Sequence, residues 1–519
     1  MCILNNLGMT VSNNNKILKN TLLLYIRMFL TMGLGLLSSR YILKSLGIVD
    51  YGIYNVVGGV VTMFTFFNAT MSSSVSRFLT FELGKENLIR LKKIFSTSLL
   101  THALLAILII ILSETIGLWF LYNKLVIPSD RFYAACWVYQ ISIISCVIGI
   151  ISVPYNSAII AHEKMGTFAF IAIIDSILKF SISVLLCYYK GDRLVLYAIL
   201  LMLVLLLDRF IYGLYCRRNF EEVRVNLLFD KKLFVSMFSF AGWNSIEHLA
   251  LMGINTGLNI LLNMFFGPIV NTARGIAYQM NGAISSFYSN FQMAMNPQII
   301  KYYAQEELVK MHKLIEFGSK LSFFLVLLIS LPVFVNTSYL LKLWLGTIPE
   351  YSVTFLRIII IITLVGSLSR PLITSVQATG NIKLFQLFQG GIMLLIVPIA
   401  YIFLRLGYPP EFVFFTHLLI EIIAMSIRIR MILPMIKYPI IDYLKNVIVP
   451  ILLTSLASFM FSLTSFYIFN SNDFISFVVI VLLSLFFTSI SIFLLGLLKN
   501  ERSILCKKIK SIYFSFVKN

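Results

Sequence analysis

Charged and titratable side chains interrupt the apolar stretches of this sequence at a small number of positions, and these residues are the candidates for chemistry. The cationic candidates are Arg27, Lys179, Arg274 and Arg370, and the acidic or titratable candidates are Asp175, Glu247, His417 and Glu421. A charged group at the middle of a membrane helix costs about 2.5–3.5 kcal/mol on insertion scales. We therefore expect each of these side chains to face a polar cavity or a partner of opposite charge.

The types of these side chains predict binding of an anion and movement of an ion. A guanidinium group holds two phosphate oxygens at once, so the buried arginines indicate a pocket for an anionic cargo. Arg370 stands directly before Pro371, where a helix is expected to kink, and this makes Arg370 a candidate gate or anion contact. The four acidic or titratable candidates are the groups that could couple transport to an ion gradient.

Each candidate also has a purely structural interpretation. Asp175 and Lys179 are spaced i,i+4, so they could neutralise each other along one face of a helix. His417 and Glu421 have the same spacing and could form a satisfied buried pair. Arg274 stands near the end of its apolar stretch, from which its long side chain could reach the lipid head groups.

The elements that must position these residues are long and apolar. The 519 residues are 59% hydrophobic and only 12% charged, and the mean hydropathy is +0.90. About 20 apolar residues cross the hydrocarbon core as a helix, and lipid tolerates only helices or closed barrels. Runs such as 104–112 and 194–207 do not alternate between apolar and polar residues, which excludes barrel strands. The predicted fold class is an all-α integral membrane protein with about fourteen transmembrane helices.

The distribution of Lys and Arg between the predicted loops gives the orientation. One set of loops, which includes segments 216–233 and 428–446, holds 27 of the 42 Lys and Arg residues, and the opposite set holds 9. Positively charged loops stay in the cytoplasm, so both termini are predicted to be cytoplasmic. The predicted spans are 20–39, 51–71, 94–114, 132–153, 167–189, 194–215, 234–263, 274–297, 314–335, 352–376, 384–404, 412–432, 447–469 and 474–497.

The sequence resembles itself at an offset of 217 to 220 residues. Segment 86–94 aligns with segment 306–314, with the acidic, aliphatic and basic positions in register. At the 217 offset, Pro154 falls on Pro371. Six spans per copy is an even number, which gives parallel repeats of the kind found in transporters. The predicted domains are an N-terminal lobe at 1–232 with helices 1–6, a C-terminal lobe at 233–440 with helices 7–12, and two extra helices with a basic tail at 441–519.

Several classes of protein are excluded by what the sequence lacks. The six cysteines form no C-x-x-C pair, so we expect neither a disulfide framework nor a zinc site. P-loop and glycine-rich phosphate motifs are absent, so we expect no nucleotide cofactor. The basic residues lie in short loops between apolar spans, where they set the orientation of the helices in the membrane. No nucleic acid is therefore expected as a partner. The N-terminal region lacks a cleavable signal pattern, and Met9 is an alternative start to Met1.

Short motifs in the predicted loops resemble those of a known family. They are Ser39-Arg40-Tyr41, Leu46-Gly47 and Tyr51-Gly52 between spans 1 and 2, Ala161 to Met165 after span 4, Gly267 between spans 7 and 8, and Ala378-Thr379-Gly380 after span 10. Together with the span count and the repeat, they make the chain resemble the polysaccharide flippases of the MOP superfamily. Within that superfamily it is most similar to the bacterial translocases of O-antigen and capsule repeat units.

This resemblance implies a V-shaped bundle that works by alternating access and is not an enzyme. Its cargo would be an oligosaccharide linked to undecaprenyl pyrophosphate, carried across the bacterial inner membrane for surface-polysaccharide synthesis and coupled to a proton or sodium gradient. The cationic cavity of the family would be supplied here by Arg27, Lys179 and Arg370. Membrane lipid, a polymerase and other glycan-assembly proteins are the expected partners.

Other functions remain open at this point. A cation-coupled multidrug and toxin exporter of the same superfamily would share the fold but would want an acid-rich lumen, whereas cations are in excess here. A membrane glycan polymerase or ligase would want a large periplasmic loop, whereas the longest predicted outer loops have about 17 residues. A membrane acyltransferase would want a His near an Asp, and the five histidines offer no His-x4-Asp spacing.

Overall fold

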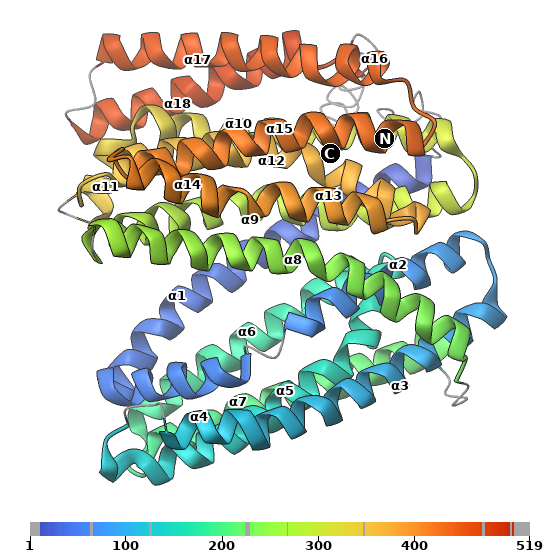
Figure 1. The fold of residues 1–519 in the computed structure, drawn as a ribbon, viewed down its shortest axis with the longest axis vertical. Coiled ribbons are helices and arrows are strands. Elements are labelled where there is room, and N and C mark those ends of the chain that lie inside the picture. Colours follow the sequence, from blue (N-terminus) through green and yellow to red (C-terminus); the bar gives the residue numbers. More distant parts are fainter. Residues whose placement is uncertain are drawn as a thin grey trace, which may run out of the picture. The chain divides into compact units, whose positions relative to one another are not determined.

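The computed structural model describes residues 11–62, 66–123, 127–223, 229–266, 268–345, 348–469, 473–498 and 501–502. Every regular element in these ranges is a helix (Figure 1), which confirms the predicted all-α fold class. Eleven helices within the described residues are long and apolar enough to cross a membrane. Their number is smaller than the predicted fourteen, so the exact count stays a prediction.

The three predicted spans outside these eleven are 20–39, 51–71 and 274–297, which lie on α1 (Val11–Thr62), α2 (Phe66–Gly84) and α9 (Pro268–Ala304). Within span 51–71, residues 63–65 lie outside the described residues. All three helices carry many small or polar residues, including the asparagines and glutamines of α9. A helix that faces polar surroundings inside a protein does not need the uniform apolar surface that lipid contact demands.

The chain divides into two compact units. The N-terminal unit comprises residues 22–245, and the C-terminal unit comprises residues 246–519 together with 1–21. The predicted lobe boundaries at 232 and 440 come from the sequence repeat, whereas these two units are defined by how compactly their residues pack. The units therefore do not test the predicted boundaries, which stay predictions.

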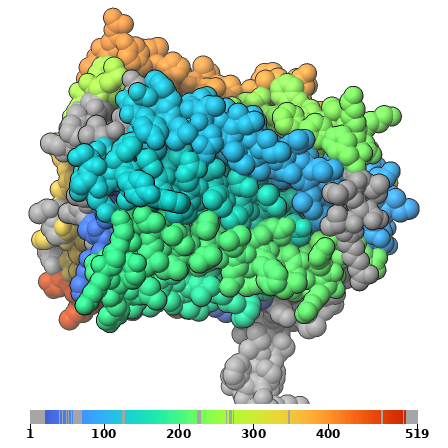
Figure 2. Space-filling view, turned by 90° about the horizontal axis from the view of Figure 1, so that it is seen from below, coloured from blue at the N-terminus to red at the C-terminus, as the bar shows by residue number. Residues whose placement is uncertain are grey.

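The N-terminal unit is organised around one central helix. Its elements are α1 from Leu22, α2, α3 (Leu88–Leu112), η3 (Ser113–Gly117), α4 (Leu118–Asn123), η4 (Ser129–Arg131), α5 (Phe132–Ala161), α6 (Met165–Tyr188), α7 (Arg193–Asn219), η5 (Glu221–Val223) and the first part of α8 (Lys231–Phe266). Helix α5 packs against α2, α3 and α7. Side chains from these helices form a continuous surface on the face shown in Figure 2, coloured from blue to green.

The π-helical turn η3 provides a hydrogen-bond partner for a buried tyrosine in the core of this unit. Tyr139 of α5 is completely buried among apolar side chains, including those of Leu121 and Leu186. Its hydroxyl donates a hydrogen bond of 2.6 Å to the backbone carbonyl of Ser113, the first residue of η3. A π-type turn leaves backbone groups for such outside partners, so the tyrosine joins α5 to the end of α3.

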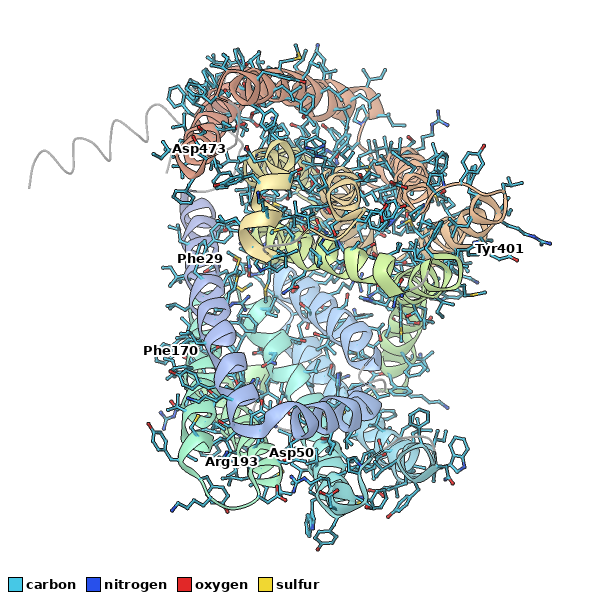
Figure 3. All side chains as sticks on the ribbon, turned by 90° about the vertical axis from the view of Figure 1, so that its left-hand side faces the viewer. Phe29, Asp50, Phe170, Arg193, Tyr401 and Asp473 are labelled. Carbon is cyan, nitrogen blue, oxygen red and sulfur yellow. The ribbon has the colours of Figure 1, made fainter. Side chains whose placement is uncertain are left out.

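One arginine joins three segments at an end of the N-terminal unit. The guanidinium of Arg131 donates to both carboxylate oxygens of Asp50 in α1, at 2.8 and 2.6 Å, and to both oxygens of Asp192, each at 3.1 Å. Asp192 also caps α7 by accepting from the backbone N–H of Leu194 at 3.1 Å. Figure 3 shows Asp50 and Arg193 at this same end. We call the three charged residues Asp50, Arg131 and Asp192 the Arg131 staple.

The C-terminal unit has α12 at its centre. Its remaining elements are α10 (Leu308–Val335), α11 (Thr337–Leu345), α12 (Ser352–Thr379), α13 (Lys383–Leu394), α14 (Ile396–Arg405), α15 (Glu411–Met435), α16 (Ile440–Tyr443), η6 (Leu444–Ile448), α17 (Val449–Phe469), α18 (Phe474–Ser491) and η7 (Ile492–Gly496). Helix α12 packs against α9, α10 and α15. Gly318 of α10 lies against the end of the Met295 side chain of α9, which would have to move to make room for a Cβ.

Helices α17 and α18 pack against α10, and a buried ion pair strengthens this contact. The ammonium of Lys320 in α10 lies 2.8 Å from both carboxylate oxygens of Glu501, which follows η7. Both side chains are almost completely buried. Removal of either partner would leave an uncompensated buried charge, so the pair links residue 501 to α10.

The backbone repeats its local geometry at the offsets found in the sequence. Glu86 and Glu306, which are 220 residues apart, both have positive φ, at 55° and 60°. The hydrogen bonds of the two turns match pair by pair, with Asn87 N–H to Glu82 C=O and Glu307 N–H to Tyr302 C=O among them. At the 217 offset, Glu163 and Gly380 also share positive φ, at 58° and 78°. These equivalent turns support the predicted internal repeat.

The first predicted loop differs from the structure. Residues 40–46 were expected in a loop between spans 1 and 2, but α1 continues through them. The chain leaves helical geometry at Gly47, with φ 75° and ψ 174°. Only glycine adopts this backbone conformation without strain, so Gly47, and not the polar residues before it, sets the turn.

Candidate functional site

A cavity inside the C-terminal unit brings together four of the predicted site residues. It has a volume of about 180 Å³ and is walled by α8, α9, α12, α13 and α15. The predicted residues in its lining are Glu247, Arg370, His417 and Glu421. The polar residues that join them there are Tyr288, Thr363, Ser369, Gln389 and Arg428. Five helices therefore converge on a polar space within an otherwise apolar unit.

Arg428 of α15 makes the densest set of contacts in this cavity. Its guanidinium donates to Glu421 Oε1 at 2.7 Å, to Gln389 Oε1 at 2.8 Å and to Ser369 Oγ at 2.5 Å. The side chains of Arg428 and Glu421 are 5% and 6% exposed. Because the pair is buried and bonded on several sides, its charges are compensated where they lie. Arg428 thus fixes three neighbouring helices around the cavity.

Arg370 of α12 is held much more loosely. Its guanidinium Nη1 lies 3.7 Å from Glu247 Oε1, and 48% of its side chain is exposed, against 13% for Glu247. Glu247 also accepts from the side-chain amide of Gln386 at 3.5 Å. The separation of Arg370 from Glu247 exceeds hydrogen-bond length. Arg370 is therefore a cation in the cavity that keeps donor capacity for another partner.

His417 lies one helical turn before Glu421 on α15, as the sequence spacing predicts. Both residues line the same cavity. The ring Nδ1 of His417 is buried and has no hydrogen-bond partner among the described residues. A buried imidazole nitrogen without a protein partner is a group that a proton or a ligand could reach from the cavity.

Arg274 of α9 lies outside the cavity lining. Its guanidinium donates to the backbone carbonyl and the side-chain oxygen of Asn255, at 3.0 and 3.2 Å, and to Asn259 Oδ1 at 3.4 Å. It also lies over the ring of Tyr278, 4.5 Å from the centroid. These contacts tie α9 to α8 and describe a structural role for Arg274.

The remaining predicted residues gather in the N-terminal unit, across α1, α6 and α7. The ammonium of Lys179 lies 2.8 Å from Asp175 Oδ1, the i,i+4 pair expected from the spacing. Asp208 of α7 is near enough to Asp175 for the two carboxyl groups to interact electrostatically. Arg27 lies over the ring of Phe168, 5.0 Å from the centroid, and interacts electrostatically with Tyr212. We call Arg27, Asp175, Lys179, Asp208 and Tyr212 the α1–α6–α7 cluster.

Arg428, Asp208 and Gln389 belong to these two sites but are not among the candidates predicted from the sequence. Arg428 was counted in the cytoplasmic segment 428–446, but it is buried inside α15. Its spacing of seven residues from Glu421 places it two turns further on the same helix face, which was a readable signal. Asp208 interrupts span 194–215, so the cost of a charge in an apolar run also pointed to it. Gln389 carries no comparable signal, because a single glutamine is common in such helices.

Three solved structures show what class of fold this is. A MATE mutant superposes with a TM-score of 0.72 at 14% identity, covering 82% of this chain and 97% of that one. A multidrug resistance MATE family transporter of the MOP superfamily, in an outward-facing conformation, gives 0.70 at 14% identity with the same coverage. The third is a MOP superfamily transporter from Pyrococcus furiosus, whose binding pocket of reversed polarity suggests a different function. It superposes with a TM-score of 0.70 at 14% identity, covering 82% of this chain and 97% of that one.

These likenesses define a polytopic membrane protein with the fold of MOP-superfamily transporters. A family profile described as "Polysaccharide biosynthesis protein" matches residues 17–303. The chain therefore belongs to the polysaccharide biosynthesis protein family, which confirms the resemblance found in the sequence. A comparison with curated proteins found no match.

Proposed function

We propose that this protein carries an oligosaccharide linked to undecaprenyl pyrophosphate from the cytoplasmic to the periplasmic leaflet of the bacterial inner membrane. The family supports a role in polysaccharide biosynthesis, and the fold supports transport by alternating access. The observation that carries the proposal is Arg370, a half-exposed guanidinium in a cavity between apolar helices.

The geometry around Arg370 suits a phosphate-bearing cargo. A guanidinium presents parallel N–H groups that match two phosphate oxygens. Glu247 lies 3.7 Å from Arg370 and is also bonded to Gln386, so an anion can replace it without leaving its carboxylate alone. Arg428 is already bonded to Glu421, Gln389 and Ser369, so its part is to hold the cavity in shape. Arg370 is the anion contact in this scheme.

Ion coupling is assigned in the same proposal to the carboxyl groups of both units. Two neighbouring carboxylates repel each other and can only accept hydrogen bonds, so we assign one shared proton to the interacting Asp175 and Asp208. Lys179 beside Asp175 stabilises the charge that remains. In the C-terminal unit, protonation of Glu421 would weaken its pair with Arg428, and His417 is the neighbouring group that can exchange a proton.

The test is complementation of surface polysaccharide in a deletion strain. Arg370→Ala removes the guanidinium and should reduce the displayed glycan by about tenfold or more, the usual effect of losing a charged hydrogen bond of roughly 1.5–3 kcal/mol. Arg370→Lys keeps the charge but loses the bidentate fork, so it should recover only part of the display. Arg405→Ala, at the end of α14, is the matched control and should behave as wild type.

Membrane-inserted protein must be measured in parallel for all three variants. Wild-type display by Arg370→Ala at equal protein levels would remove Arg370 from the cargo site. A loss in Arg405→Ala as large as in Arg370→Ala would mean that the assay reports a general effect of lost positive charge.

A second candidate function is export of cationic drugs. It is favoured by the two acids in the cavity, Glu247 and Glu421, and by the likeness to a multidrug resistance transporter. Each acid has an arginine partner, however, so the lining has no net negative charge to attract a cation. Efflux of an organic cation by the purified protein in vesicles, with normal glycan in the deletion strain, would establish this function instead.

A further inference from the structure

A second, larger cavity lies in the N-terminal unit, and it shares no lining residue with the cavity that contains Arg370. Its volume is about 490 Å³. Three cationic side chains line it: Arg90 and Lys93 of α3 and Lys232 of α8. Among the described residues of its lining, the one acid is Asp230, whose Oδ1 accepts a hydrogen bond of 3.1 Å from the backbone N–H of Leu233. The lining is therefore net positive, and its one acid is engaged at a helix start.

Backbone geometry adds to the positive potential of this cavity. Asn87 caps the start of α3 through a hydrogen bond from Arg90 N–H to Asn87 Oδ1 at 3.1 Å, and Asp230 caps the start of α8. Both capping residues line the cavity. Two helix N-termini thus point their positive ends at one space that already holds three cations. This combination selects for an anion.

The cations are available to a ligand. Among the described residues, neither Lys93 nor Lys232 belongs to an ion pair. Arg90 pairs through Nε with the buried carboxylate of Glu82 at 3.2 Å, and its side chain remains 59% exposed. Glu82 therefore holds the guanidinium of Arg90 in place through Nε, while much of the Arg90 side chain stays exposed to a ligand.

The equivalent place in the C-terminal unit provides an internal comparison. At the 220 offset, Asn87 corresponds to Glu307 and Arg90 corresponds to Lys310. There the ammonium of Lys310 lies 2.5 Å from Glu307 Oε1, so the helix start is neutralised by its own acid. The net positive cavity is thus a property of the N-terminal unit and not of the repeated turn.

The cavity also has apolar side chains in its lining. They are Phe78, Ile89 and Leu233, and Ile89 is 75% exposed. The cavity lies where α3 and α8 begin, beside the starts of the predicted spans 94–114 and 234–263, and so near the expected depth of the lipid head groups. Exposed apolar side chains beside cations at this depth are the surroundings of a lipid, whereas a free phosphate ion would gain nothing from them.

We propose that this cavity binds the phosphate head group of an anionic glycerophospholipid, with the acyl chains lying along Ile89 and α8. Lys93, Lys232 and Arg90 contact the phosphate, and Asn87 and Ser236 supply polar contacts to the glycerol. The site is independent of the proposed cargo route, because none of its residues lines the cavity that contains Arg370.

The experiment measures binding of phosphatidylglycerol to the full-length protein in nanodiscs of phosphatidylcholine. Lys93→Gln with Lys232→Gln removes two charges and leaves the Arg90–Glu82 pair intact, so the fold should be undisturbed. The matched control, Lys310→Gln with Lys313→Gln, removes the same charge from the other unit. At about fivefold per cation, the first variant should bind phosphatidylglycerol about 25-fold more weakly, and the control should change less than about twofold.

Three outcomes would overturn the proposal. They are equal weakening in both double variants, no weakening in Lys93→Gln with Lys232→Gln, and displacement of phosphatidylglycerol by millimolar inorganic phosphate. The last of these would assign the cavity to a soluble phosphate. Retention of phosphatidylglycerol in the presence of phosphate, together with the selective weakening, would establish the lipid site.

Discussion

At the scale of single residues, the C-terminal cavity separates two arginines by their surroundings. Arg428 is buried and bonded to Glu421, Gln389 and Ser369, whereas Arg370 is half exposed beside Glu247. In a low-dielectric interior a charge with several partners is fixed, and a charge with one distant partner can be recruited by a ligand. This difference assigns structural support to Arg428 and cargo contact to Arg370.

The stability of the Arg428 network can be measured directly. Arg428→Met should lower the stability of the purified protein by about 3–5 kcal/mol, because the carboxylate of Glu421 remains buried without its partner. Adding Glu421→Gln removes that stranded charge and should recover part of the loss. Thermal unfolding in detergent measures both variants. A double variant as unstable as Arg428→Met alone would show that the ion pair is not the source of the effect.

The Asp175–Asp208 pair yields a prediction about coupling. Asp208→Asn would replace the proposed shared proton with a permanent N–H donor to Asp175, so transport down a cargo gradient should persist while stimulation by a proton gradient disappears. For one coupled proton this stimulation is at most about tenfold per pH unit. Transport of lipid-linked oligosaccharide into vesicles, with and without a pH difference, measures it. Asp473→Asn, just before α18, is the control, and a response like wild type in Asp208→Asn would exclude the pair.

At the scale of elements, charged side chains replace the apolar contacts that bind helices together in water. Helices in lipid gain nothing from hiding apolar surface from one another, so close packing and polar contacts hold them. The Arg131 staple joins α1, the start of α5 and the start of α7, and the Lys320–Glu501 pair joins α10 to the segment after α18. Both connect segments that are distant in sequence.

The Arg131 staple predicts a dependence of stability on pH. Burial alone would raise the pKa of Asp192, but hydrogen bonds from Arg131 and from the backbone of Val195 and Leu194, together with the Arg131 charge, bring it below the ordinary value of 3.8. A carboxylate with a lowered pKa stabilises the fold above pH 3.8, and this contribution is lost as the pH falls through the lower folded-state value.

Arg131→Gln should therefore destabilise the protein at pH 7 by about 1 kcal/mol, since the staple is partly exposed to solvent. Below pH 3.8 the difference between Arg131→Gln and wild type should shrink. Thermal unfolding at a series of pH values measures it. A difference that stays constant with pH would mean that the staple acts through packing and not through its charges.

At the scale of the whole molecule, orientation is the property to test. The positive-inside bias predicts that both termini are cytoplasmic. On this prediction the loop before α7 is periplasmic and the loop before α10 is cytoplasmic. In a cysteine-free background, Lys190→Cys should react with an impermeant maleimide added to intact cells, and Gln305→Cys should react only after lysis. Both positions are exposed. The reverse labelling pattern would contradict the topology.

The sequence alone determined the class of molecule and much of its plan. Apolar runs long enough to cross lipid demand helices, and repeated local motifs such as 86–94 and 306–314 reappear as matching turns because their hydrogen bonds lie within a few residues. The Asp175–Lys179 pair was also readable, because i,i+4 neighbours meet on any helix.

Only the tertiary structure decided which charges share a site. Glu247, Arg370 and Arg428 lie on α8, α12 and α15, and no spacing along the chain says that these helices meet around one cavity. The same holds for Lys232, which reaches the cations of α3 from a helix more than a hundred residues later. Helix periodicity is local, whereas the choice of neighbouring helices depends on side-chain packing between segments that are far apart in sequence.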